Sequence, residues 1–108
     1  MGNELIKGHL DPLLMAVVEQ SPLHGYAIIE ELRRRSQGEF DLPEGTVYPA
    51  LHRLERQGYL ASRWDSSHGR RRRVYELTRA GRKALEARRS EWHGFRSAIS
   101  AVLGAADA

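Results

Sequence analysis

The sequence predicts a mainly α-helical fold with a small β-hairpin, and three observations support this. Apolar residues recur at three- and four-residue intervals through the first half of the chain, which is typical of amphipathic helices. Two short segments of alternating character follow, separated by a polar stretch, and this pattern predicts a hairpin. A helical spacing of apolar residues then continues almost to the end of the chain. The chain has 108 residues and a mass of 12.3 kDa, the size of a single domain, so we expect these elements to form one compact unit.

The first helix is predicted to begin at Asp11, because a capping carboxylate there precedes Pro12 at the first helical position. It ends before the pair Ser21-Pro22, since a residue that precedes proline is disfavoured in a helix. The buried stripe of this helix contains Leu13, Leu14, Val17 and Val18.

A second helix is predicted from His24 to Ser36, with Gly38 as its C-terminal cap. Its last turn holds Arg33 to Arg35, where the helix dipole favours cations. Its inward-facing residues are Ile28, Ile29 and Leu32.

A third helix is predicted from Glu44 to Gln57, and Gly58 ends it. Proline is tolerated only near a helix start, so Pro49 places that start near Gly45 or Thr46. The buried seam is Val47, Leu51 and Leu54. The opposite face is polar and basic, and it carries Gly45, Thr46, Pro49, His52, Arg53 and Arg56.

The predicted hairpin consists of Tyr59 to Trp64 and Arg72 to Leu77. Alternation directs Tyr75 and Leu77 toward the core and directs Arg72, Val74 and Glu76 away from it. The run Arg70 to Arg73 therefore lies at the hairpin tip.

The last helix is predicted to begin after the cap Thr78 and to run to about Leu103, too long for a core of this size. Its seam residues are spaced 3, 4, 3, 4, 3, as in a coiled coil, and this seam needs another helix, most simply from a second copy of the chain. The seam residues are Leu85, Arg88, Trp92, Phe95, Ile99 and Val102.

The composition argues against catalysis and against a metal or cofactor. The chain has no cysteine, its five histidines are scattered, and no Ser/His/Asp set, phosphate loop or carboxylate pair occurs. It lacks a signal peptide and a membrane span, so we expect a cytoplasmic protein. The net charge of +3 hides an uneven distribution. Residues 63–83 hold eight basic and two acidic residues, or +6, and the rest of the chain carries −3.

Three helices followed by a hairpin predict a winged helix-turn-helix. We expect residues 1–77 to form this DNA-binding domain and residues 78–108 to form a C-terminal dimerisation helix. In such a domain the third helix is the recognition helix, which enters the major groove, and the arginine-rich tip reaches the adjacent backbone or minor groove.

Three segments of the chain resemble the PadR family of transcriptional regulators. They are LHGYAIIEEL at Leu23 to Leu32, GTVYPALHRLERQGYL at Gly45 to Leu60, and GRRRRVYELTRAGRKAL at Gly69 to Leu85. The single C-terminal helix is similar to that of the small PadR subfamily.

The resemblance implies a dimeric repressor on double-stranded, pseudo-palindromic operator DNA. The recognition-helix candidates that it implies are Thr46, Tyr48, Pro49, His52 and Arg53. The wing candidates are Arg70, Arg71, Arg72 and Arg73. Gly25 and Tyr26 match positions where the family places backbone N–H groups and a tyrosine against phosphate or the core.

The resemblance also implies a small aromatic or drug-like effector at the dimer interface, beside Trp92. Arg88 and Phe95 are the other effector candidates. The dimerisation candidates are Leu85, Trp92, Phe95, Ile99 and Val102.

Several alternatives stay open at this point. Tyr48 contacts phosphate or packs on the second helix, whereas Tyr26 is expected to pack. Trp92 and Phe95 line an effector pocket or form plain dimer core. The rival function is an effector-independent winged-helix module that binds DNA without sequence preference or binds proteins, and an enzyme is the third class.

Overall fold

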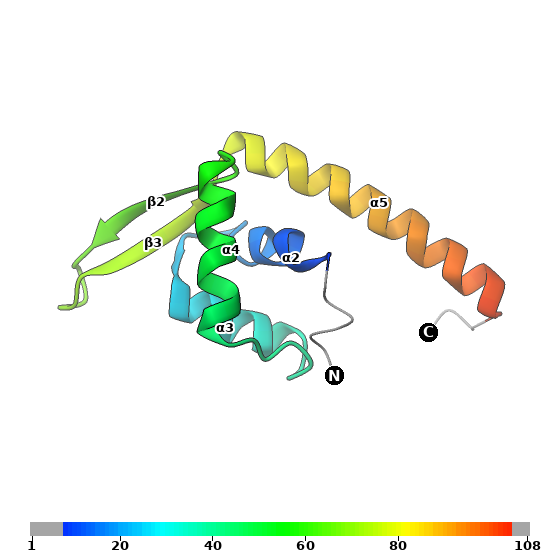
Figure 1. The fold of residues 1–108 in the computed structure, drawn as a ribbon, viewed down its shortest axis with the longest axis horizontal. Coiled ribbons are helices and arrows are strands. Elements are labelled where there is room, and N and C mark those ends of the chain that lie inside the picture. The colour runs from blue at the N-terminus through cyan, green and yellow to red at the C-terminus, as the bar shows by residue number, and fades with distance from the viewer. Residues whose placement is uncertain (1–7, 105–108) are drawn as a thin grey trace.

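The computed structural model describes residues 8–104 and confirms a mainly helical fold with a small antiparallel sheet (Figure 1). Strand β3 is central in the sheet, whose order is β1-β3-β2. The elements in chain order are α2 (Leu10–Val17), β1 (Leu23–His24), α3 (Gly25–Arg35), α4 (Glu44–Arg56), β2 (Leu60–Asp65), β3 (Arg72–Leu77) and α5 (Arg79–Leu103).

Helix α2 begins at Leu10, two residues before the predicted first helical position, Pro12, and the prediction that Asp11 caps it is wrong. His9 is the N-cap residue, without a side-chain capping bond, and Asp11 lies in the first turn. The Asp11 carboxylate instead accepts a hydrogen bond from Arg53, far along the chain on α4. A long-range ion pair has thus replaced the local cap that the sequence suggests.

Helix α3 begins at Gly25, because His24 is its N-cap and not its first residue. The His24 Nδ1 atom accepts a hydrogen bond from the Ala27 backbone N–H at 3.3 Å. Leu23 and His24 are extended and pair with Tyr75 and Val74 of β3. This third strand was not predicted, since two residues are too few to show alternation.

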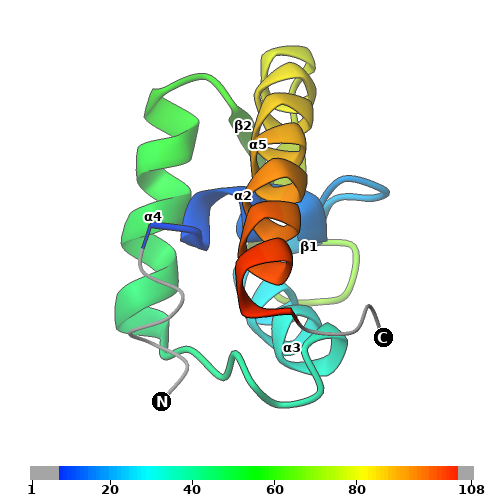
Figure 2. The same ribbon diagram turned by 90° about the vertical axis from the view of Figure 1, so that its right-hand side faces the viewer.

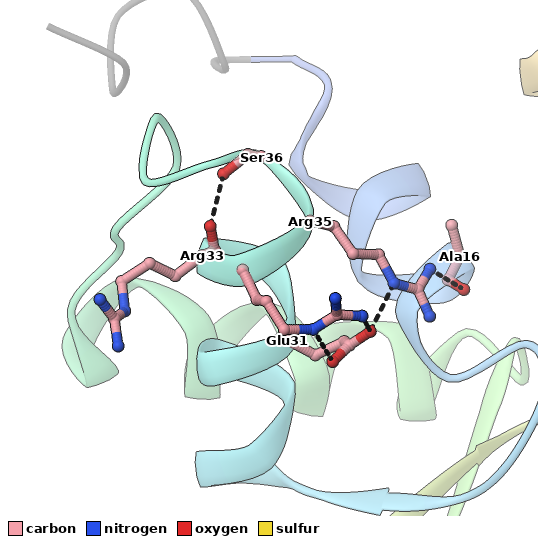
Figure 3. Close-up of polar contacts among 6 residues, drawn as sticks. Ala16, Glu31, Arg33, Arg35 and Ser36 are labelled. Atoms are coloured by element: carbon pink, nitrogen blue, oxygen red, sulfur yellow. Dashed lines mark hydrogen bonds and ion pairs between the residues drawn. The ribbon is translucent and has the colours of Figure 1, made fainter.

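The C-terminal end of α3 is tied to its own helix and to α2 (Figure 3). Arg35 contacts the Glu31 carboxylate at 2.7 Å and donates to the Ala16 carbonyl oxygen at 3.4 Å. Hydrogen bonds from Arg34 and Arg35 lower the pKa of Glu31 to about 2. Ser36 is the C-cap and Gln37 (φ +56°) is the first left-handed residue, so the cap predicted at Gly38 is two residues late. Gly38 (φ +87°) completes the turn by donating to the Arg33 carbonyl.

Helix α4 begins at Glu44 with Pro43 as its N-cap, slightly before the predicted start. Pro49 is therefore the sixth helical residue and leaves the Gly45 carbonyl without its usual helical donor. The seam Val47, Leu51 and Leu54 is fully buried, as predicted.

The hairpin is shifted by one residue in its first strand and matches the prediction in its second. Leu60 pairs with Leu77, and Trp64 pairs with Arg73. Tyr75 and Leu77 are buried in the core as expected. Val74 was predicted to face away and does lie outside the main core, yet it is buried, because it sits on the central strand of the sheet.

Helix α5 starts inside the core and then leaves it (Figure 2). Thr78 caps the helix by accepting a hydrogen bond from the Gly81 N–H at 3.0 Å, as predicted. Leu85 is only 2% exposed and belongs to the core cluster. Beyond it the helix extends past the other elements, and the hairpin and α5 lie at opposite ends of the longest dimension of the molecule, 52 Å against 28 and 21 Å (Figure 1).

Helix α2 and the turn that follows it support the middle of α5 through ionic contacts. Arg89 contacts both carboxylate oxygens of Glu19, at 2.7 and 3.0 Å, and also binds Glu86. Arg88 donates to the Gly8 carbonyl oxygen at 2.9 Å and lies 3.6 Å from Glu91 of its own helix. Arg88, the charged residue of the predicted seam, thus has partners within its own chain. Within residues 8–104, no helix is both long enough and apolar enough to cross a membrane.

We expect Gly81→Ala to lower the free energy of unfolding by about 1–3 kcal/mol, because a methyl group there must displace its neighbours. A Cβ atom at this position would overlap the Tyr59 carbonyl oxygen and lie 2.6 Å from Leu77 Cδ1. Gly94 of the same helix has open space around its Cβ position, so Gly94→Ala is the control and should stabilise by about 0.5–1 kcal/mol. Urea denaturation followed by circular dichroism measures both, and equal effects would contradict the close approach at Gly81.

Candidate nucleic-acid interface

The outward face of α4 is the first part of the candidate interface. Its opposite face is buried on the core, which fixes the direction in which the polar residues point. The predicted face is exposed at five of its six positions: Gly45, Thr46, Pro49, His52 and Arg56. Arg53 is the exception, because its guanidinium group is half-buried and pairs with Asp11 of α2. Arg53 therefore holds α4 against α2.

Of the two tyrosines, Tyr48 packs on α3, one of the two alternatives for it, and Tyr26 lies at the surface. Tyr48 is half-buried, and its ring occupies the space next to Gly25, where a Cβ atom would come within 2.5 Å of the Tyr48 hydroxyl oxygen. Burial and the nearby Glu44 carboxylate raise the pKa of Tyr48. Tyr26 is 55% exposed, so the prediction that it packs is wrong. Because Gly25 lacks a side chain, the ring of Tyr48 takes the inner position, and Tyr26 stays at the surface.

The turn of the hairpin is organised by Asp65. Its carboxylate accepts hydrogen bonds from the backbone N–H and the hydroxyl of Ser67, both at 3.1 Å, and these bonds lower the pKa of Asp65. Gly69 follows with φ +87° and donates to the Ser66 carbonyl. This turn directs the chain into the arginine run, and the hairpin projects from the helices (Figure 1).

The four wing arginines lie in different environments. Arg70 and Arg71 are exposed, whereas Arg72 and Arg73 are half-buried. The Arg72 guanidinium contacts the imidazole of His24 on β1, and Arg72 Nη1 is 2.7 Å from His24 Nε2. Arg73 contacts Ser62 at 2.8 Å and the Glu55 carboxylate at 3.5 Å.

His24 joins α3 to the wing, a role that the sequence did not suggest. Its two ring nitrogens face the Ala27 N–H and the Arg72 guanidinium, which are both donors. A neutral imidazole has one acceptor nitrogen, so only one of these contacts is a hydrogen bond at a time. Burial lowers the pKa of His24, and the positive charges of Arg72 and His68 lower it further. The ring is therefore neutral at neutral pH.

The positive charge of residues 63–83 is almost entirely unpaired. Within the part of the chain that the structure describes, Arg73 is the one basic residue of this segment in an ion pair. Outside this segment several arginines of the helices are paired, with Glu19, Glu30, Glu31 and Asp11. The wing is thus an unneutralised cationic surface beside the exposed face of α4.

The residues predicted for dimerisation and effector binding divide into two groups. Leu85 is buried in the core of its own chain, so it is not available to a second copy, which corrects its assignment to the interface. Trp92, Phe95, Ile99 and Val102 are exposed. The Trp92 ring lies 5.9 Å from the ring of Phe95 and makes an edge contact with His9 at 5.6 Å. Among residues 8–104 no three metal-ligating side chains gather.

Comparisons with known proteins agree with this geometry. Residues 13–87 match the model of the transcriptional regulator PadR-like family. The chain is 46% identical over 63 residues to the transcriptional regulator Rv3488 of Mycobacterium tuberculosis, covering 58% of this chain and 56% of that protein. It is 30% identical over 91 residues to an uncharacterised protein of Lysinibacillus sphaericus, covering 83% and 84%. A PadR family transcription regulator from Clostridium difficile R20291 superposes with a TM-score of 0.78 at 33% identity, covering 88% and 98%.

Proposed function

The chain belongs to the PadR-like family of transcriptional regulators, and on this premise we propose that it is a repressor that binds operator DNA as a homodimer and is released by a small aromatic effector. The observation that carries the proposal is the exposed polar face of α4 next to an unpaired cationic hairpin. A face of that kind, held by a buried seam on a rigid core, fits a major groove.

Recognition of sequence is assigned to the exposed residues of α4. Thr46 and Pro49 present small surfaces near the start of the helix, and His52 presents a ring that both donates and accepts. The N-terminal residues of a recognition helix contact base edges, which suits Thr46 and Pro49, and His52 lies about one turn further along the same face. Arg53 takes no part in the proposal, because Asp11 already holds it.

Most of the affinity is assigned to the wing. Arg70, Arg71 and Arg72 have no acidic partner among the described residues, so their charge is free to neutralise phosphates. Release of counterions from the DNA then drives binding, and it makes the affinity depend steeply on salt.

A second copy of the chain is assigned to the exposed seam of α5. Phe95 is 53% exposed, and it shares the seam with Trp92, Ile99 and Val102. Large apolar residues that line one stripe of a projecting helix gain free energy when a partner helix covers them. A dimer would also place two recognition helices roughly 34 Å apart, one turn of DNA.

The effector is assigned to the same interface, at Trp92 and Phe95 with Arg88 beside them. The indole and phenyl rings offer flat apolar surfaces for a planar aromatic compound. Such a compound would favour one spacing of the two α5 helices and so shift the population away from the DNA-binding form. The proposed role as a repressor rests on the resemblance to the family.

We expect Arg71→Ala and Arg72→Ala to weaken binding to all duplexes and to reduce the slope of log K against log salt by about 0.9 for each phosphate that the variant no longer neutralises. His52→Ala should instead cost about 1–3 kcal/mol on the preferred sequence and little on random DNA. Fluorescence anisotropy with DNA from upstream of the protein's own gene and with random DNA measures both.

Arg34→Ala is the control for these variants, because Glu31 already pairs with this surface cation, so the salt slope should stay unchanged. Equal losses on both duplexes for His52→Ala would contradict the recognition-helix assignment. Equal affinity of the unaltered protein for both duplexes would favour the rival function, a winged-helix module without sequence preference.

We expect Phe95→Glu to convert the dimer to a monomer, because a carboxylate buried without a partner costs several kcal/mol, of the order of the association energy. Ser97→Glu adds the same charge on the opposite side of α5, where the residue is exposed, and should leave the dimer intact. Sedimentation velocity distinguishes the two states. A Phe95→Glu dimer, or a monomer for both variants, would contradict the proposed interface.

We expect planar aromatic compounds to quench the fluorescence of Trp92 and to release bound DNA at matching concentrations. The chain has two tryptophans, so the titration uses Trp64→Phe, in which only Trp92 emits. The matched control is Trp92→Phe, in which Trp64 should not respond. The absence of quenching across a panel of such compounds would leave Trp92 and Phe95 as dimer core.

A further inference from the structure

Trp64 is an exposed indole on the wing that the proposed function does not use. It is 52% exposed on β2, directly across from Arg73 on β3. Two guanidinium groups lie over its ring: the Cζ atom of Arg71 is 4.4 Å from the ring centroid, and that of Arg73 is 5.2 Å away. Both distances are within the range of cation–π attraction.

Two of the three guanidinium nitrogens of Arg73 have partners within the protein. Its Nε atom donates to the Ser62 hydroxyl at 2.8 Å, and its Nη2 atom lies 3.5 Å from Glu55 of α4. Ser62 in turn donates to the Glu55 carboxylate at 2.6 Å. This network joins both strands of the hairpin to the C-terminal part of α4. Arg73 is thereby neutralised and committed to the inside of the wing.

Arg71 is held in a different way. It is exposed and has no acidic partner among residues 8–104, and its Cζ atom lies over the Trp64 ring, 4.4 Å from the ring centroid. The N–H groups of a guanidinium lie in its plane, so stacking leaves them free to bind phosphate oxygens. Stacking also restricts a long side chain that would otherwise lose much rotamer entropy on binding DNA.

We propose that Trp64 is a positioning residue that holds Arg71 ready for a DNA phosphate, and that Arg73 joins the wing to α4 and makes no phosphate contact. This inference rests on the proposed function, in which the wing contacts DNA. It divides the arginine run into residues that bind phosphate and one that fixes the direction of the hairpin.

The test is a double-mutant cycle with Trp64→Leu and Arg71→Ala, measured on a random duplex from about 50 to about 200 mM salt. Trp64→Leu should weaken binding about threefold to tenfold and leave the salt slope unchanged, because no charge is removed. Arg71→Ala should reduce the slope by about 0.9 for each wing bound. The double variant should bind like Arg71→Ala alone.

Two conservative variants and one further substitution complete the set. Trp64→Phe should recover much of the affinity, because it restores an aromatic face. Arg71→Lys should keep the salt slope and lose affinity, because it keeps the charge without the planar group. Arg73→Ala should leave the salt slope unchanged and lower the melting temperature.

Three results would overturn the proposal. If Trp64→Leu weakens binding equally in the Arg71→Ala background, Trp64 acts through the stability of the hairpin alone. If Arg71→Ala leaves affinity and slope unaltered, Arg71 contacts no phosphate. If Arg73→Ala lowers the salt slope as Arg71→Ala does, Arg73 is a phosphate contact. Failure of the unaltered protein to bind any duplex would instead overturn the proposed function.

Discussion

The arrangement of the molecule depends on one joint, where the end of α4, the start of the hairpin and the start of α5 meet. The Thr78 hydroxyl lies 2.7 Å from the Gly58 carbonyl oxygen and 3.1 Å from that of Tyr59, and it also caps α5 through the Gly81 N–H. The Thr78 N–H donates to the same Tyr59 carbonyl. Gly81 lets this backbone approach, since any side chain there would overlap the Tyr59 oxygen. The directions of the wing and of α5 relative to α4 are therefore coupled at this joint, and the Arg73–Glu55 and Arg89–Glu19 pairs support them further out. In a dimer joined through α5, this joint would also carry the spacing of the two recognition helices.

Charge is arranged around this frame in two ways. Acidic residues of the body are used as ties: Glu19 binds Arg89, Asp11 binds Arg53 and Glu55 binds Arg73. Each tie joins two elements that are distant in sequence, and each neutralises the arginine that it holds. Residues 60–77, the hairpin, hold five arginines against Asp65 and Glu76, and among the described residues Arg73 is the one of these arginines in an ion pair. The net charge of +3 thus equals that of the hairpin, because basic and acidic residues are equal in number in the rest of the chain.

Much of the fold could be predicted because its signals are local. The buried seam of α4, the Thr78 cap and the ends of α3 and α4 depend on spacing and on the conformational preferences of a few residues. Strand β1 could not be predicted, because two residues become a strand only when β3 lies beside them. The Asp11 cap was predicted from local sequence, but the Asp11 carboxylate accepts a hydrogen bond from Arg53 of α4, which is distant in sequence. The exposure of Tyr26 was missed for a similar reason, since the space at Gly25 belongs to Tyr48.

The winged helix-turn-helix, its family and the faces of its helices can be inferred from the sequence alone, because periodicity, caps and turn residues act over a few positions. Which arginines and which seam residues are free depends on the tertiary structure. Arg53 and Arg73 carry the same charge as Arg70 and Arg71, yet acids on neighbouring elements hold the first two, while the second two face solvent. Leu85 has the same seam spacing as Phe95, yet it lies in the core. Pairing and burial depend on what the fold places next to each side chain, and local sequence does not contain that information.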